Sequence, residues 1–114
     1  MQFRSLARTS CLFRVGENGT LRLTNVSGFT PYEGMAYGQP MVISEGNLQI
    51  DGGYYCNMID SFSSSGSTRG AAILIDGGTA VINGGRYAGT ACGIAVRNDA
   101  QLTVNNGYIG SLDT

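Results

Sequence analysis

The sequence predicts an all-β fold, a parallel β-solenoid of about four coils, from three observations. Short segments in which apolar residues alternate with other residues recur four times along the chain. Turns rich in glycine and asparagine separate these segments, and their apolar positions match from one segment to the next. Equivalent residues return at separations of 28, 32 and 21 positions. Such returns indicate coils stacked at about 4.8 Å rather than a sheet of hairpins.

Each coil begins with a strand, a turn and a second strand, at residues 12–23, 41–50, 72–82 and 93–104. Because alternate residues of a strand share a face, the apolar positions predict buried columns. The first strands supply two columns, which are Phe13, Met41, Ile73 and Ile94, then Val15, Ile43, Ile75 and Val96. The second strands supply two more, which are Leu21, Leu48, Ala80 and Leu102, then Leu23, Ile50, Ile82 and Val104. Val42 and Leu74 are then expected to point outward as a short apolar strip.

A sharp corner is predicted after the second strand of each coil. The triplets at 51–53 (Asp-Gly-Gly), 83–85 (Asn-Gly-Gly) and 105–107 (Asn-Asn-Gly) share one register, and Gly and Asn tolerate positive φ. We expect their stacked Asp and Asn side chains to bond the backbone of the neighbouring coil. The first coil has Thr-Asn-Val at 24–26, which predicts an altered corner. Tyr55, Tyr87 and Ile109 then form a third inward column, which predicts a three-sided cross-section.

The chain is interpreted as one domain, residues 1–114, with insertions at 29–39 and 56–70. Both insertions precede the first strand of a coil, so both are expected to bulge from the same side. The first and last coils expose apolar columns and strand edges. We therefore expect the C-terminal face to be covered by more of a longer chain, by an identical subunit or by another partner, in end-to-end contact.

The coils resemble the right-handed parallel β-helix of the pectin lyase-like superfamily. The segments GGTAVINGGRYAG and NDAQLTVNNGYIG are similar to the GGTLTINGG repeats of bacterial surface passengers and adhesin-like β-helix proteins. The likeness covers about residues 11–110, while the FTPYEGMAYG stretch and the Thr-Asn-Val corner depart from the repeat. The resemblance implies a location outside the cell, at its surface or on a virion. It implies no single activity, because the fold hosts lyases, hydrolases, adhesins and viral spikes.

Composition narrows the classes of function. The net charge is −1, all seven cations are Arg, and no basic cluster exists, so a nucleic-acid partner is not expected. The absence of His argues against imidazole-based chemistry and most zinc sites, and we expect neither a cofactor nor a metal. No apolar run suits a membrane span, and no secretory signal peptide is visible. Cys11, Cys56 and Cys92 have no C-x-x-C spacing and are interpreted as small hydrophobes.

The enzymes of this superfamily act on polysaccharides, and their hydrolases use two or three acids on one sheet. Most acids here occupy turns instead. Glu17, Glu45, Asp76 and Asp99 gather near the first turns of successive coils, where they are either solvated or hold a cation. We therefore expect no catalytic residue and a non-catalytic structural or adhesive module. The alternative is a lyase, hydrolase or tailspike-like domain that acts on polysaccharides.

Candidate binding residues follow the glycine corner. Tyr54, Arg86 and Tyr108 hold the outward position on three consecutive coils, so their side chains are expected to stack with the guanidinium between two rings. This strip either receives sugar rings or is only a self-stabilising ladder across the strands. Tyr32 and Tyr37, in the first insertion, add aromatic residues on a loop that is suited to recognition of a glycan or a protein.

Overall fold

A computed structural model describes residues 2–4, 13–30, 40–57, 71–89 and 92–111 of the chain. These residues form thirteen β-strands and no helix, so the predicted all-β class is confirmed. After β1 (Gln2–Arg4), the strands recur in groups of three, which we call repeats. The strands of the repeats are β2 (Phe13–Val15), β3 (Thr20–Leu23) and β4 (Val26–Thr30); β5 (Val42–Ser44), β6 (Asn47–Ile50) and β7 (Gly53–Asn57); β8 (Ala71–Asp76), β9 (Thr79–Ile82) and β10 (Arg86–Gly89); and β11 (Cys92–Arg97), β12 (Gln101–Val104) and β13 (Tyr108–Ser111).

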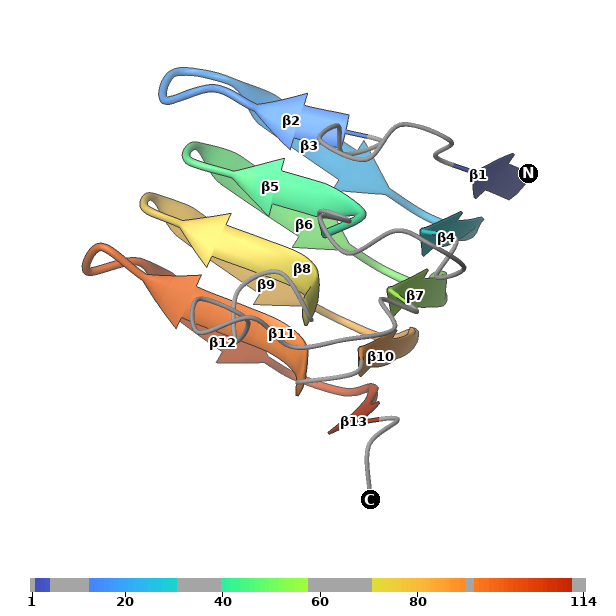
Figure 1. Cartoon of the computed structure of the whole chain (residues 1–114). Helices are drawn as coiled ribbons and strands as arrows, with labels where there is room; N and C mark the ends of the chain where they lie inside the picture. Colours follow the sequence, from blue (N-terminus) through green and yellow to red (C-terminus); the bar gives the residue numbers. More distant parts are fainter. Residues whose placement is uncertain (1, 5–12, 31–39, 58–70, 90–91, 112–114) are drawn as a thin grey trace.

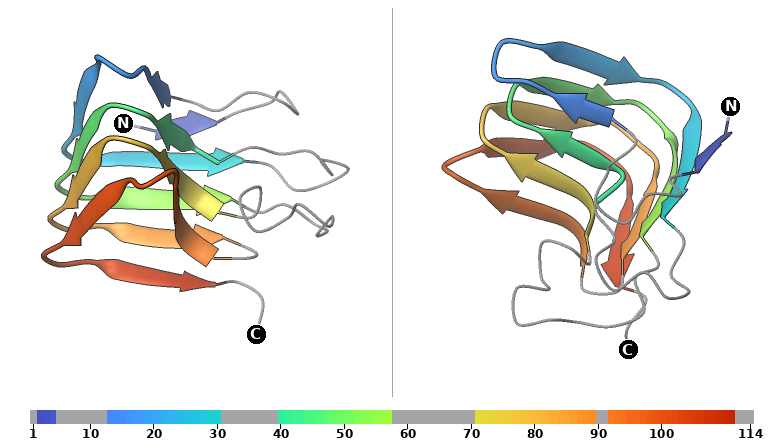
Figure 2. Two further views of the ribbon diagram at one scale, coloured as in Figure 1. Left: turned by 90° about the vertical axis from the view of Figure 1, so that its left-hand side faces the viewer. Right: turned by 45° about the horizontal axis from the view of Figure 1, so that its top comes forward.

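Three parallel sheets run along the stack of repeats. Sheet A has the order β1-β4-β7-β10-β13, sheet B the order β11-β8-β5-β2, and sheet C the order β12-β9-β6-β3. Each sheet therefore takes one strand from every repeat (Figure 1). Figure 2 shows the strands of each repeat wrapping around a common interior, with the repeats displaced along one direction. This arrangement is consistent with a β-solenoid.

The core lies between the three sheets and follows the predicted columns. On sheet C, Leu48 pairs in register with Leu21 and Ala80, and Ile50 pairs with Leu23 and Ile82. On sheet A, Tyr55 and Tyr87 pair in register, as their predicted column requires, and both residues are 1 % exposed. The Tyr55 and Tyr87 rings stack with centroids 5.2 Å apart at an angle of 7°.

The predicted register of β5 is wrong by one residue. Phe13 pairs with Val42 rather than with Met41, and Val15 pairs with Ser44 rather than with Ile43. Val42 therefore belongs to the inward column with Ile73, and its side chain is fully buried rather than outward. The alternation could not fix this register because both faces of β5 are buried.

The outward partner of Leu74 is Ile43, since these two residues are in register on β8 and β5. Leu74 and Ile43 are only 3 % and 5 % exposed. The expected exposed apolar strip at Val42 and Leu74 is therefore absent from this face.

Three corner glycines have positive φ, as the corner motif predicts. The values are +116° at Gly53, +104° at Gly85 and +146° at Gly107. In the first repeat Val26 holds the position that pairs with Gly53, which is the altered corner expected there.

The predicted insertions begin later than expected. Phe29 and Cys56, their first residues, lie within β4 and β7. The remainder, residues 31–39 and 58–70, lies outside the described residues. Among the described residues, no helix is present that could cross a membrane.

Candidate functional site

The strip of Tyr54, Arg86 and Tyr108 lies on the outer side of sheet A. Arg86 pairs in register with Tyr54 on β7 and with Tyr108 on β13, as the repeat predicts. The Arg86 Cζ atom lies 5.8 Å from the centroid of the Tyr108 ring, a cation–π contact. Tyr108 is 77 % exposed and Arg86 is exposed, whereas Tyr54 is half-buried. Arg86 and Tyr108 therefore present a cation and an aromatic ring that are both open to solvent.

Tyr54 is tied to its own strand. A hydrogen bond with the Cys56 side chain, two residues along β7, raises the pKa of Tyr54, and partial burial raises it further. The nearby positive charge of Arg86 lowers the pKa of Tyr54, so these two side chains interact electrostatically. Cys56 is buried, and burial raises the pKa of its thiol. Tyr54 and Cys56 thus remain neutral near pH 7, and Arg86 supplies the charge of the strip.

Small residues flank the exposed part of the strip. Ala88 and Gly110 are register partners, two positions beyond Arg86 and Tyr108 on the same face. A Cβ atom built at Gly110 would meet nothing within 4 Å. Space is therefore open beside Gly110, on the same face as the Tyr108 ring, which suits a ligand such as a sugar ring.

The inner face of sheet A holds the strip in place. The Tyr87 hydroxyl donates to the Gly84 carbonyl at 2.6 Å, and the Tyr55 hydroxyl donates to the Gly52 carbonyl at 2.9 Å. Each buried ring thereby anchors the corner that precedes its own strand. Because Tyr87 directly follows Arg86 in β10, the stacked rings fix the backbone from which the strip projects.

Three arginines outside the strip are paired with carboxylates of neighbouring repeats. Three ion pairs join Arg14 to Glu45, Arg22 to Asp51 and Arg97 to Asp76, at 3.0, 2.8 and 2.8 Å. The sequence analysis did not predict these three ion pairs. Each pair joins adjacent repeats across 21 to 31 residues of sequence. An alignment of the repeats could therefore have predicted these pairs.

Arg86 differs from these three arginines. Among the residues that the structure describes, it has no ion pair with a carboxylate. Its positive charge is therefore available to a ligand.

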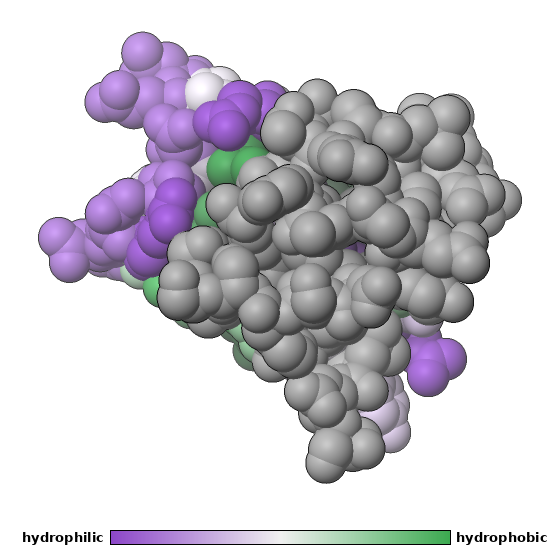
Figure 3. All heavy atoms as spheres, viewed as in Figure 1, coloured by the Kyte–Doolittle hydropathy of each residue, from purple (hydrophilic) through white to green (hydrophobic). Residues whose placement is uncertain are grey.

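Among the described residues, the acids at the first turns belong to no group of three metal-type ligands. Glu45 and Asp76 are neutralised by Arg14 and Arg97. Asp76 also accepts a hydrogen bond from Asn98, and the bonds from Arg97 and Asn98 lower its pKa. Figure 3 shows hydrophilic side chains gathered at the left edge, where Figure 1 places these turns.

A polar ladder crosses the corners of the repeats. Asn105 Nδ2 donates to Asn83 Oδ1 at 2.8 Å, and Asn83 Nδ2 donates to Asp51 Oδ1 at 2.9 Å. Asp51 also accepts from Gln49 and Arg22. The corner side chains therefore bond one another rather than the backbone of the next repeat, which corrects the expectation from the sequence.

This ladder predicts acid sensitivity. Bonds from Asn83, Gln49 and Arg22 lower the pKa of Asp51 from its ordinary 3.8 to about 2. Because the folded state has the lower pKa, the stability that Asp51 contributes is complete above the unfolded value and is lost as the pH falls through about 2. We expect the unfolding temperature of the wild type to fall more steeply over this range than that of Asp51→Asn. Thermal unfolding by circular dichroism measures both slopes, and equal slopes would contradict this role.

The structure describes three of the five predicted binding residues. Tyr54, Arg86 and Tyr108 form one column, as predicted, whereas Tyr32 and Tyr37 lie outside the described residues. Cys11 also lies outside them, and Cys56 and Cys92 form no disulfide within the described residues. Comparison of the chain with protein-family models, curated proteins and solved structures finds no match.

Proposed function

We propose that the chain is a non-catalytic structural or adhesive module, a right-handed parallel β-helix of about four coils that is related in fold to the pectin lyase-like superfamily. It works outside the cell, at a surface or on a virion, and stacks end to end with its neighbours. The strip of Tyr54, Arg86 and Tyr108 is its binding surface, and a glycan is the ligand that this surface fits best.

The contact of Arg86 with Tyr108 carries this proposal. An exposed ring offers an apolar face to the C–H groups of a sugar, and a guanidinium donates to hydroxyl or carboxylate oxygens. Arg86 is free of carboxylate partners among the described residues, and Tyr108 is 77 % exposed. A rigid parallel sheet holds the two groups, so little ordering is required on binding.

The carboxylates support a non-catalytic role. A general acid that cleaves glycosidic bonds needs a raised pKa, so that it still carries its proton near neutral pH. Hydrogen bonds and arginine partners instead lower the pKa values of Asp51 and Asp76. Both carboxylates are therefore held as structural anions in ion pairs.

A glycan array tests this function. We expect the wild type to retain one class of glycan and Tyr108→Ala to lose about tenfold in affinity, since stacking on an aromatic ring is worth up to about 1.4 kcal/mol. Arg86→Ala is expected to lose a similar factor. Thr103→Ala, a matched change at an exposed outward position of β12, is expected to bind as the wild type does.

The same glycans are then incubated with the protein, with and without calcium, and analysed for cleavage. Release of shorter saccharides that is lost in Asp76→Asn or Asp99→Asn would replace this proposal with the polysaccharide-active alternative. If Tyr108→Ala and Arg86→Ala retained the same glycans as strongly as the wild type does, the strip would not be the binding surface.

A further inference from the structure

Three Asn-Gly dipeptides occur in the chain, at residues 18–19, 83–84 and 106–107. Asparagine is a thermolabile residue, because the backbone nitrogen of the next residue can attack its side-chain amide. Glycine favours this attack, since it has no Cβ atom to hinder the approach. The outcome depends on where the amide and the nitrogen are held, and the structure holds the three dipeptides differently.

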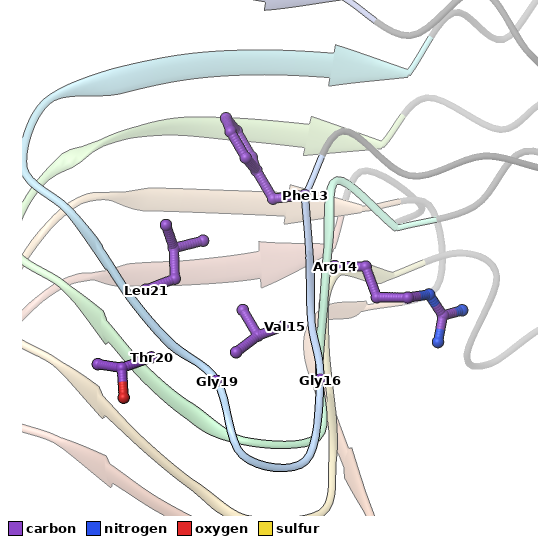
Figure 4. Close-up of a pocket in the computed structure, with 7 residues that line it drawn as sticks. All are labelled: Phe13, Arg14, Val15, Gly16, Gly19, Thr20 and Leu21. Atoms are coloured by element: carbon purple, nitrogen blue, oxygen red, sulfur yellow. The ribbon is translucent and has the colours of Figure 1, made fainter.

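The turn between β2 and β3 directs the nitrogen of the first dipeptide away from its amide. The Gly19 nitrogen donates to the Gly16 carbonyl at 2.8 Å. Figure 4 shows Gly16 and Gly19 on the two sides of this turn. The nitrogen that would attack is therefore bonded across the turn and is not available to the Asn18 side chain.

The polar ladder fixes the amide of the second dipeptide. Asn83 Oδ1 accepts a hydrogen bond from Asn105 at 2.8 Å, and Asn83 Nδ2 donates to Asp51 at 2.9 Å. Both ends of this amide are thus held by neighbouring repeats. The Asn83 amide cannot turn toward the Gly84 nitrogen unless both hydrogen bonds break.

The third dipeptide has the opposite arrangement. The Gly107 nitrogen donates to Asn106 Oδ1 at 2.9 Å, so the nucleophile already lies against the amide that it attacks. Asn106 and Gly107 are both exposed, so water reaches them. Asn105, and not Asn106, is the member of the polar ladder at this corner. The Asn106 amide is therefore placed for reaction, whereas the ladder restrains the Asn83 amide.

We propose that Asn106 is a deamidation site of the folded chain, and that its conversion places a negative charge at the corner before β13. This modification goes beyond the proposed function and does not rest on glycan binding. The two can therefore fail separately.

The reaction needs water as its only co-reactant. The Gly107 nitrogen gives its proton to hydroxide and bonds to Asn106 Cγ, while the Cγ–Nδ2 bond breaks and Nδ2 leaves as ammonia. Water then opens the cyclic imide. Addition at Cγ gives aspartate, and addition at the main-chain carbonyl carbon gives isoaspartate, whose backbone runs through the former side chain. Overall, water is consumed and ammonia is released, with no oxidation or reduction.

Both products alter the chain at the start of β13. Each product carries a carboxylate two residues before Tyr108. Isoaspartate also adds a carbon atom to the backbone ahead of Gly107, where φ is +146°. The next residue begins the pairing of β13 with β10, since the Tyr108 nitrogen donates to the Gly85 carbonyl at 2.9 Å. We therefore expect isoaspartate to weaken the pairing of β13 more than aspartate does.

Ageing of the folded 114-residue chain in mildly alkaline buffer, followed by peptide mass spectrometry, tests the proposal. Cleavage after arginine separates the three dipeptides into peptides 15–22, 70–86 and 98–114. We expect conversion of amide to acid about tenfold faster in the last peptide, because the other two dipeptides must first break hydrogen bonds. Fragmentation of this peptide assigns the change to Asn106, and chromatography separates aspartate from isoaspartate.

The unfolded chain is the matched control. In guanidinium chloride the hydrogen bonds of all three dipeptides are lost, so we expect the three peptides to convert at similar rates. In the folded chain, Asn106→Gly restores the Gly-Gly sequence of the two preceding corners and should abolish conversion in peptide 98–114. Asn105→Ala removes the donor to Asn83 Oδ1 and should speed conversion of Asn83. Circular dichroism checks the fold of each variant.

Three results would overturn the proposal. The first is a folded wild type in which peptide 15–22 or 70–86 converts as fast as peptide 98–114. The second is conversion of peptide 98–114 that persists in Asn106→Gly. The third is a folded chain that does not convert over a time in which the unfolded chain does.

Discussion

Replacement of Gly53 by alanine is expected to destabilise the protein by about 4 kcal/mol, through strained backbone and overpacking together. Gly53 has a φ of +116°, which L side chains rarely adopt. An added Cβ would lie 2.1 Å from the Val26 carbonyl oxygen and 2.9 Å from the Tyr55 hydroxyl. The Val26 oxygen belongs to the backbone of the preceding repeat and cannot move aside without breaking the stack. Urea denaturation measures the loss.

Gly16→Ala is the matched control for this prediction. Gly16 lies in the first turn, its φ is outside the left-handed range, and a Cβ there would meet nothing within 4 Å. Alanine also restricts the unfolded chain, so we expect stability to change by less than about 1 kcal/mol, or to rise. Equal losses for Gly53→Ala and Gly16→Ala would show that the corner is not tightly packed.

Truncation of Tyr87 is expected to have a comparable effect. Tyr87 is 1 % exposed, stacks on Tyr55 and bonds the Gly84 carbonyl. Tyr87→Ala leaves a cavity between the sheets and is expected to cost about 3–5 kcal/mol. Such a loss is a large fraction of the stability of a domain of this size. Denaturant unfolding followed by tyrosine fluorescence measures it.

Tyr87→Phe separates the ring from the hydroxyl. Phenylalanine keeps the stacking on Tyr55 and loses only the bond to the Gly84 carbonyl, so we expect a cost of about 1–2 kcal/mol. If Tyr87→Phe cost as much as Tyr87→Ala, the hydroxyl rather than the ring would anchor the corner.

The sequence was sufficient to predict the sheets because most strands have one buried face. Ile50 and Ile82, for example, alternate with the half-buried Gln49 and Val81, and the predicted pairing of these strands is confirmed. The corner glycines were predictable for a related reason, since few residues other than Gly accept a positive φ.

The β5 strand shows where this reasoning fails. Ile43 and Val42 are both buried, although they point to opposite faces, and the inward position beside Val42 is taken by the polar Ser44. A period-2 pattern carries no information when both faces are buried. The register predicted for β5 is therefore wrong by one residue.

The long-range polar contacts were not predicted for another reason. Arg14 and Glu45 are paired only because the chain returns after 31 residues, and local patterns contain no signal of that pairing. Strand β1 was likewise not predicted, because three residues show too little alternation to identify a strand. The strip of Arg86 and Tyr108, by contrast, followed directly from the repeat register.

Binding of a glycan by this strip without turnover is the central claim, and isothermal titration calorimetry with the glycan class retained on the array tests it most directly. We predict saturable binding by the wild type and by Thr103→Ala, about tenfold weaker binding by Tyr108→Ala, and an unchanged glycan recovered afterwards. Equal affinity of Tyr108→Ala and the wild type, or a cleaved glycan in the recovered sample, would contradict the claim.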